Sequence, residues 1–309
     1  MFSVVIFIER GGKRLISALW VLTLFSTSFA AGLIGAILGI GGGAIIVPVL
    51  SSLLGMPIKE AIAASLVCVV ATSVASSRKY LPQGLVNPRL ALFLEMGTVI
   101  GAVIGAFSAF MVSPMVLHIA LGVILIILAA VQLKGARRED DMIRLMTFSR
   151  TSEDSLAKIF KLSSKYYDSH FKVDVEYRVT NSGLGLASSL LAGLISGALG
   201  LGGGIFKVPI MNRLMKIPIK VSIATSELMI GMTGSIGAIT YFSLGLLNLE
   251  IVTPMVIGIA VGSTIGAIVM SKMRASRIRI AFSLLLIYLS YMALGKGLSL
   301  AFNITLPGV

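Results

Sequence analysis

Two charged side chains lie in otherwise apolar stretches of this chain. Lys207 follows three consecutive glycines, and Glu227 lies further along the same half of the sequence. Charges in apolar segments are costly, so they are usually paired or functional. Lys207 could attract a small anion, while Glu227 could pair with Lys207 or carry a coupling proton. Alternatively, Lys207 reaches the surface from a shallow hairpin, and Glu227 forms only a structural salt bridge. Glu95 is also flanked by apolar residues, but the nearby Arg89 favours a shallow location.

The three glycines before Lys207 have a counterpart near the start of the chain. Glycine weakens a helix by about 1 kcal/mol relative to alanine, so each triplet predicts a helix break followed by a short helix. The N–H groups at the start of such a helix carry positive partial charge and bind anions. Alternatively, the glycines only allow helices to pack closely. The candidate substrate-binding residues at the two breaks are Gly41, Gly42, Gly43, Gly202, Gly203, Gly204 and Lys207.

Four hydroxyl side chains follow the triplets at matching positions and are further substrate-binding candidates. Ser65 and Thr72 are seven residues apart, and Ser226 and Thr233 repeat that spacing. Each pair therefore lies on one helix face. These side chains could line a pathway and donate hydrogen bonds, although hydroxyls in membrane helices often bond to their own backbone instead. The residues assigned to helix breaking or coupling are Glu227, Pro48 and Pro209.

All of these positions belong to two copies of one pattern, related by a constant offset of 161 residues. The matches run without a gap from Gly32 to Gly105 in the first copy. They include glycines spaced four apart, which lie on one helix face and favour close helix packing. A hydrophobic chain with two copies, each interrupted by glycine and proline at the same place, is typical of a secondary transporter. The spaced glycines are Gly97, Gly101 and Gly105, with Gly258, Gly262 and Gly266.

The composition indicates a polytopic helical membrane protein. The chain has 309 residues, of which 56% are hydrophobic and 13% are charged. A soluble protein cannot bury that much apolar surface. The net charge of +13 is explained by basic cytoplasmic loops rather than by nucleic-acid binding. One cysteine and two histidines form no metal pattern, and no enzyme motif is present, so neither a cofactor nor catalysis is expected. The apolar stretches near transmembrane length are 15–40, 60–77, 90–111, 115–133, 184–201, 221–242, 251–270 and 280–294.

The two halves differ in the charge of their equivalent loops. The loop at 78–89 carries three basic residues, whereas its counterpart at 239–250 carries none. Because basic residues mark cytoplasmic loops, equivalent loops should lie on opposite sides of the membrane. The predicted fold is therefore an all-α polytopic membrane protein with two inverted-topology repeats. Each repeat should contain a Gly/Pro-broken re-entrant hairpin and about three to four transmembrane helices.

The polar stretch between the repeats is expected to be a cytoplasmic linker. Within it, Ser152 before Glu153 and Asp154 is typical of a helix N-cap and predicts a short amphipathic helix. A solvated linker of variable structure is the alternative. The apolar segment that ends near Ala30 is expected to be retained, because cleavage would remove most of the first repeat's opening helix. The expected divisions are an N-terminal tail with the start of the first helix (1–21), the first repeat (22–135), the linker (136–182), the second repeat (183–297) and a C-terminal tail (298–309).

The doubled element G-x-G-G-G-x-x-x-x-P resembles the TauE/SafE sulfite exporter family. It runs from Gly39 to Pro48 and again from Gly200 to Pro209, and the resemblance covers nearly the whole chain outside the N-terminal tail and the linker. It implies a plasma-membrane transporter of small sulfur-containing anions, or of other small oxyanions and carboxylates. It also implies export or uptake coupled to the proton gradient, with the glycine triplets and the two prolines in the substrate region.

The sequence therefore predicts a secondary transporter of sulfite, sulfoacetate or other organosulfonates in the plasma (inner) membrane. Export by alternating access is expected, around a midplane site formed by the two broken helices. The expected partners are a small anionic substrate, protons as the coupling ion and the lipid bilayer, but no nucleic acid. A homo-oligomer is compatible with the sequence. The alternatives are a channel or uniporter for another small anion or carboxylate, and a non-transporting membrane sensor.

Overall fold

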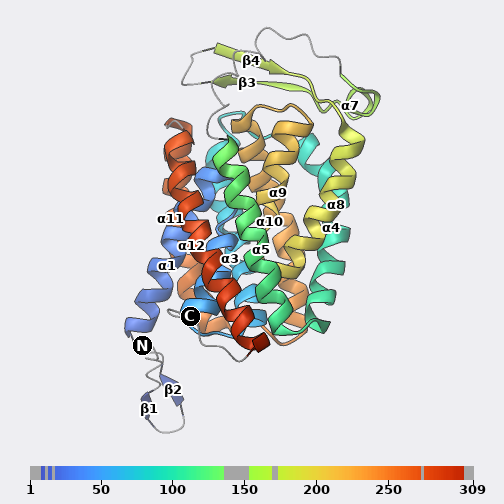
Figure 1. Ribbon diagram of the computed structural model, residues 1–309. Coiled ribbons are helices and arrows are strands. Elements are labelled where there is room, and N and C mark those ends of the chain that lie inside the picture. The colour runs from blue at the N-terminus through green and yellow to red at the C-terminus, as the bar shows by residue number, and fades with distance from the viewer. Residues whose placement is uncertain are drawn as a thin grey trace.

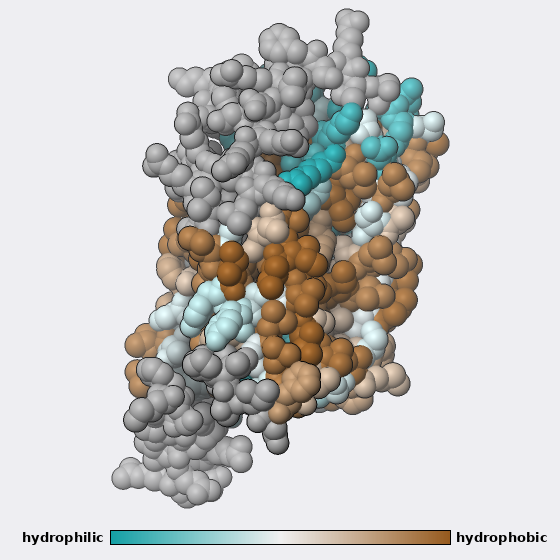
Figure 2. Space-filling view, viewed as in Figure 1, coloured by the Kyte–Doolittle hydropathy of each residue, from teal (hydrophilic) through white to brown (hydrophobic). Residues whose placement is uncertain are grey.

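The computed structural model describes residues 8–10, 13–15, 18–135, 153–168, 173–272 and 275–302. Within these residues the chain is mostly helical, and the long helices form one bundle (Figure 1). Hydrophobic residues form a broad band around the middle of the face seen in Figure 2. Seven of the described helices are long and apolar enough to cross a membrane. The predicted polytopic helical membrane protein is confirmed at this level.

Each half of the bundle has the same order of elements. The two short helices, the π-helices after them and the penultimate long helices have boundaries that match at the 161-residue offset. The first half contains α1 (Ala18–Leu38), α2 (Gly43–Pro48), η1 (Val49–Leu53), α3 (Ile58–Tyr80), α4 (Pro88–Met111) and α5 (Pro114–Gly135). The second half contains α8 (Ser182–Leu199), α9 (Gly204–Pro209), η2 (Ile210–Leu214), α10 (Ile219–Ser243), α11 (Leu249–Lys272) and α12 (Ala275–Phe302).

The spaced glycines join the two halves by close helix contacts. The three glycines of α4 face α8, and a Cβ on Gly101 would collide with the backbone oxygen of Leu190. The equivalent glycines of α11 face α1, where a Cβ on Gly262 would collide with the backbone oxygen of Phe29. The predicted packing role of these glycines is therefore confirmed. Each half contributes the glycine-bearing helix on which the first helix of the other half packs.

Helices α1 and α8, which open the two halves, start at opposite ends of the bundle in Figure 1. The hairpin of β1 (Ile8–Arg10) and β2 (Lys13–Leu15) lies at the end where α1 begins. The hairpin of β3 (Ser164–Asp168) and β4 (Val173–Tyr177) lies at the other end, where α8 begins. The chain therefore enters its second half from the end of the bundle opposite to the end at which the first half starts.

A small cap made of β3, β4 and α7 (Ser155–Ile159) covers one end of the bundle. Helix α7 is capped by Asp154, whose Oδ1 accepts a hydrogen bond from the Ala157 N–H at 2.7 Å. Ser152, the expected cap, lies outside the described residues. Asp154 also accepts hydrogen bonds from the N–H and the hydroxyl of Ser182 at the start of α8. Partial burial opposes ionisation of Asp154, but these hydrogen bonds outweigh it and hold its pKa below the ordinary value.

The β3–β4 hairpin was not predicted from the sequence. Its antiparallel register pairs Tyr166 with Val175, and both side chains are buried against the bundle. Asn87, the N-cap of α4, donates hydrogen bonds to the Leu162 backbone oxygen at 2.7 Å and to the Tyr177 hydroxyl at 2.9 Å. Burial raises the pKa of Tyr177 to about 12, although its hydrogen bonds act in the opposite direction. The cap is thus attached to the first half at α4 and to the second half at α8.

Candidate functional site

The two glycine triplets interrupt the helical backbone inside the bundle. Gly41 and Gly42 have φ angles of 69° and 74°, and Gly202 and Gly203 have φ angles of 71° and 73°. Side chains with a Cβ rarely adopt this left-handed conformation, which explains the glycines. The short helices α2 and α9 begin at the third glycine of each triplet. The predicted breaks and the short helices after them are therefore confirmed.

The prolines that follow the breaks occupy a different kind of position. Pro48 is the last residue of α2 and Pro209 the last residue of α9, and each is followed directly by a π-helix. Proline has no backbone N–H, so the carbonyl four residues earlier loses its usual hydrogen-bond donor in the α-helix. The wider turn of a π-helix begins at this point. The chain thus departs from helical geometry at the glycines and continues as a widened helix after the prolines.

The two breaks contact each other across the centre of the molecule. The Ser65 hydroxyl donates a hydrogen bond to the Gly200 backbone oxygen at 2.8 Å, and the Ser226 hydroxyl donates to the Gly39 oxygen at 3.0 Å. Both serines are completely buried. The sequence left open whether they line a pathway or bond to their own helix. In the structure they bond to the backbone of the opposite half and hold the two breaks together.

Lys207 lies beside the second break in a buried polar cluster. Its Nζ lies 3.1 Å from Glu95 Oε2 and donates a hydrogen bond to the Thr233 hydroxyl at 2.7 Å. Thr233 in turn bonds to Glu95 Oε1, and the Thr98 hydroxyl donates to Glu95 Oε2 at 3.1 Å. Lys207 is 1% exposed and Glu95 is 4% exposed. We call these four residues the Lys207 cluster, which is built from α9, α4 and α10.

The Lys207 cluster corrects two expectations. Glu95 is not shallow but buried, because α4 continues well beyond Arg89 into the bundle and turns this side chain toward α9 and α10. Lys207 pairs with Glu95 and not with Glu227, and it does not reach the surface. A signal for Glu95 existed in the sequence. Its counterpart in the second copy is Val256, so Glu95 differs between the copies in the same way as Lys207 and Glu227.

A buried hydroxyl group without a hydrogen-bond partner among the described residues lies next to Lys207. The Ser196 hydroxyl is completely buried and has no hydrogen-bond partner among the described residues. A Cβ on Gly203 would lie 3.3 Å from Ser196 Oγ and 3.4 Å from Lys207 Cε, so both side chains border the same glycine. Ser196 was not singled out in the sequence. Its counterpart is Gly35, so comparison of the two copies would also have found it.

Glu227 lies at the first break, which belongs to the other half of the chain. It is 0% exposed, and its Oε2 accepts a hydrogen bond from the Ser76 hydroxyl at 2.8 Å. Its Oε1 has no partner with hydrogen-bond geometry among the described residues, although the Gly41 backbone lies close enough to interact with the carboxylate. Thr72 bonds to the backbone oxygens of Gly41 and Cys68, at 3.3 Å and 3.0 Å. Glu227 therefore has no cationic partner in the described part of the chain.

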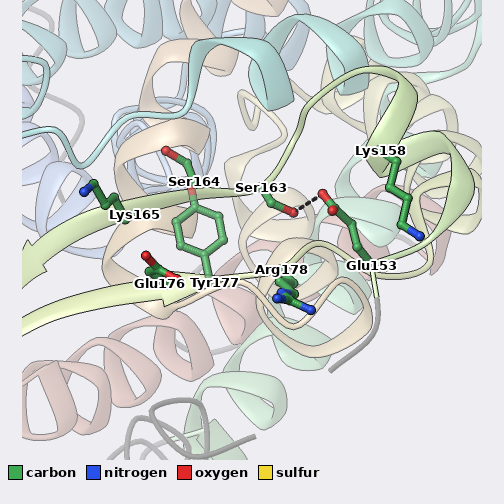
Figure 3. A pocket seen from close by; sticks show the side chains of 8 residues that line it. All are labelled: Glu153, Lys158, Ser163, Ser164, Lys165, Glu176, Tyr177 and Arg178. Atoms are coloured by element: carbon green, nitrogen blue, oxygen red, sulfur yellow. Dashed lines mark hydrogen bonds between the residues drawn. The ribbon is translucent and has the colours of Figure 1, made fainter. Parts of the chain in front are cut away.

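A surface pocket lies in the cap, away from both breaks (Figure 3). It carries charges of both signs, and the Ser163 hydroxyl points toward Glu153 and bonds to it. None of the candidate residues from the sequence takes part in it. No group of three or more possible metal ligands occurs among the described residues. The pocket is lined by Glu153, Lys158, Ser163, Ser164, Lys165, Glu176, Tyr177 and Arg178.

The fold and the interior site define a class of protein. A bundle with an apolar belt, helices broken at its centre and a buried ion pair beside one break are the features of a multi-pass membrane transporter. The family model described as "Sulfite exporter TauE/SafE" matches residues 24–292, so the chain belongs to the TauE/SafE sulfite exporter family. Its members are membrane transporters and not enzymes.

Two relatives are similar along nearly their whole length. The "Probable membrane transporter protein YunE" of Bacillus subtilis is 25% identical over 276 residues, which cover 87% of this chain and 95% of the relative. The "Probable membrane transporter protein MJ0441" of Methanocaldococcus jannaschii is 25% identical over 279 residues, which cover 85% of this chain and 91% of the relative. No solved structure matches the chain significantly.

Proposed function

We propose that this protein transports small sulfur-containing anions, such as sulfite, sulfoacetate or other organosulfonates, across the plasma membrane. The direction is export, driven by the proton gradient, and the mechanism is alternating access around a central site between the two broken helices. The observation that carries this proposal is the buried Lys207 beside the second break. The family's description as sulfite exporters supports the choice of anion.

The surroundings of Lys207 suit a small oxyanion. Its ammonium group supplies the positive charge, and the Ser196 hydroxyl is a hydrogen-bond donor without a partner among the described residues. Both border Gly203, at the start of α9, where backbone N–H groups add positive partial charge. In this proposal the triplets Gly41–Gly43 and Gly202–Gly204 form the walls of the site. Thr72 and Thr233 lie next to it, and Ser65 and Ser226 hold its halves together.

The proposed transport cycle requires two inverted halves. Support comes from the opposite starting ends of α1 and α8 in Figure 1 and from the exchanged packing of α1 on α11 and α8 on α4. Inverted repeats that meet at the midplane can open alternately to the two sides. In this arrangement each broken segment acts as a re-entrant hairpin. The cap lies on the cytoplasmic side in our proposal, because its described part carries several exposed basic residues.

Proton coupling needs a buried group that can gain and lose a proton. Among the described residues, two carboxylates are buried within the bundle, namely Glu95 and Glu227. The role of Glu227 as the coupling residue remains a prediction, supported by its unpartnered Oε1. Both carboxylates lie next to a helix break, so either could respond to occupation of the site.

The test is sulfite flux into proteoliposomes, with and without an imposed pH gradient. Concentrative movement that a protonophore abolishes supports the proposal, and Lys207→Ala should remove it. Lys158→Ala, which changes an exposed lysine of the cap, is the matched control and should transport normally. Flux that only follows the sulfite gradient would favour a channel or uniporter. If sulfite, sulfoacetate and simple sulfonates all fail to move, the proposed substrate class is wrong.

A further inference from the structure

We propose that Glu95 is a built-in competitor of the transported anion, and that it takes up a proton whenever an anion replaces it at Lys207. This inference rests on the proposed function, because it assumes that an anion binds at Lys207. It assigns the coupling proton to Glu95, a residue to which the sequence gave no role in transport.

The contacts of Glu95 are those that an oxyanion substrate would make. One oxygen accepts hydrogen bonds from Thr98 and from the Lys207 ammonium at 3.1 Å, and the other bonds to Thr233. A carboxylate and a sulfite or sulfonate group are both compact anions that accept hydrogen bonds through several oxygens. The Lys207 cluster therefore has the features of an oxyanion-binding site. The carboxylate of Glu95, a residue of α4, occupies the position that the anion would take.

The burial of the cluster limits how a second anion can enter. Lys207 and Glu95 together carry no net charge, and both are almost fully shielded from solvent. Adding an anion without any other change would leave one buried negative charge unpaired, which is strongly unfavourable. If Glu95 takes up one proton from the solution on the side that the anion enters, the neutral carboxyl group releases Lys207. Lys207 then pairs with the anion, and with a monovalent anion the cluster is neutral again.

Few other ionisable groups are placed to share this proton. Helix α8, which packs along α4, has no ionisable side chain in its sequence, and α9 contributes only Lys207. Helix α10 contributes Glu227, which bonds to Ser76, and also carries Lys220 and Tyr241, each at least two turns from Thr233. On α4 itself the other charge is Arg89, in the first turn. Lys207 is thus the ion-pair partner of Glu95 among the described residues.

This exchange links anion binding to pH. For the wild-type protein in detergent, calorimetry in buffers of different ionisation heat should detect about one proton taken up per bound anion. The apparent affinity should then tighten about tenfold for each unit of decrease in pH. Methanesulfonate is the probe for proton counting, because it is a monovalent anion that stays ionised around neutral pH, whereas sulfite itself titrates near neutrality. Sulfoacetate, which carries a second negative charge, is a probe for binding only. Glu95→Gln should bind the same probes without proton uptake and with an affinity that does not change with pH.

Two further variants make the test specific. Glu95→Asp keeps a carboxylate and should retain proton uptake, which a purely structural role of Glu95 does not predict. Glu250→Gln, an exposed carboxylate in the first turn of α11, is the matched control and should behave like the wild type. If Glu95→Gln is too unstable to purify, binding without proton uptake in the wild type would by itself overturn the inference.

The remaining outcomes separate this inference from the proposed function. Proton uptake that persists in Glu95→Gln but disappears in Glu227→Gln would overturn the role of Glu95 and support Glu227, with anion transport intact. If the wild type binds and transports none of the probes or sulfite, the proposed function fails, and the role of Glu95 fails with it.

Discussion

The two helix breaks have nearly the same backbone but different surroundings. Gly42 and Gly203 have φ angles of 74° and 73°, and each is followed by a six-residue helix and a π-helix. A buried serine hydroxyl bonds across to each break from the other half. The duplicated sequence therefore produces two equivalent openings in the helical backbone.

The side chains at the two breaks differ in polarity. Ile46 occupies the position equivalent to Lys207, and Ile259 occupies the position equivalent to Thr98. At the first break, Ile259 Cδ1 lies 3.3 Å from where a Cβ on Gly42 would be. At the second break, the corresponding space is bordered by Ser196 and Lys207. The comparison shows that the backbone is common to both breaks, whereas the cation is present at only one.

Each break also receives a carboxylate from the opposite half. Glu95 of the first half reaches the second break and pairs with Lys207. Glu227 of the second half lies near the first break and has no cationic partner among the described residues. In our proposals the second break therefore binds the anion and its Glu95 takes up the proton, whereas Glu227 at the first break is the alternative site for that proton.

The largest effect is expected when the second break is made to resemble the first. Lys207→Ile should abolish anion uptake and leave Glu95 buried without its cation, which costs about 3–5 kcal/mol. Adding Glu95→Val, the residue found in the other copy, should restore most of the stability but not the transport. Thermal unfolding in detergent and flux in proteoliposomes measure the two effects separately. Normal transport by either variant would show that the cation at the second break is not needed for anion transport.

A smaller and equal effect is expected from alanine at the third glycine of each triplet. A Cβ on Gly43 would collide with the Gly200 backbone oxygen, and one on Gly204 with the Gly39 oxygen. Because backbone must move in both cases, each variant should lose about 1–3 kcal/mol of stability. Gly183→Ala is the control, since its Cβ would meet only Leu156 Cδ1 at 3.6 Å. Markedly unequal losses in thermal unfolding would show that the backbones are not equivalent.

The two bridging serines should also respond alike, with a smaller change. Ser65→Ala and Ser226→Ala each remove one buried hydrogen bond and leave a carbonyl oxygen without that donor, so about 1–2 kcal/mol should be lost. Serine-to-alanine replacement at the exposed Ser155 provides a comparison outside the bundle. Equal shifts in the unfolding temperature would support a shared structural role, and a selective loss of transport in one variant would contradict it.

The smallest effect concerns the cap at the start of the second half, where Asp154 bonds to α7 and α8. Because Asp154 has a lowered pKa in the folded protein, its contribution to stability is present above its unfolded pKa and is lost as the pH falls through its folded pKa. Asp154→Asn should preserve most of the capping at neutral pH, within about 0.5 kcal/mol, and remove this acid dependence. Hydrogen exchange of the Ala157 and Ser182 amides as a function of pH measures it. An unchanged acid profile in the variant would exclude Asp154 as its cause.

Local patterns predicted the helices and both breaks, because hydrophobic length and consecutive glycines act within a short stretch of chain. Comparison of the two copies also singled out Lys207, although it left open whether this side chain is buried or reaches the surface. The partner of Lys207 could not be found in this way, because its ion pair with Glu95 depends on how α4 and α9 pack at long range. The β3–β4 hairpin was missed although apolar and acidic residues alternate from Val173 to Tyr177, a pattern typical of strands. The other strand, β3, has no such alternation, because Tyr166 and Tyr167 are adjacent.

The exchanged packing of the halves has a consequence for how the protein is made. When the first half leaves the ribosome, the glycine-bearing face of α4 has no helix packed on it until α8 has been synthesised. Likewise, α1 must wait for α11, the penultimate long helix of the chain. The helix packing of the first half is therefore incomplete until most of the second half has been synthesised. Separately expressed halves should accordingly be short-lived alone and accumulate when produced together.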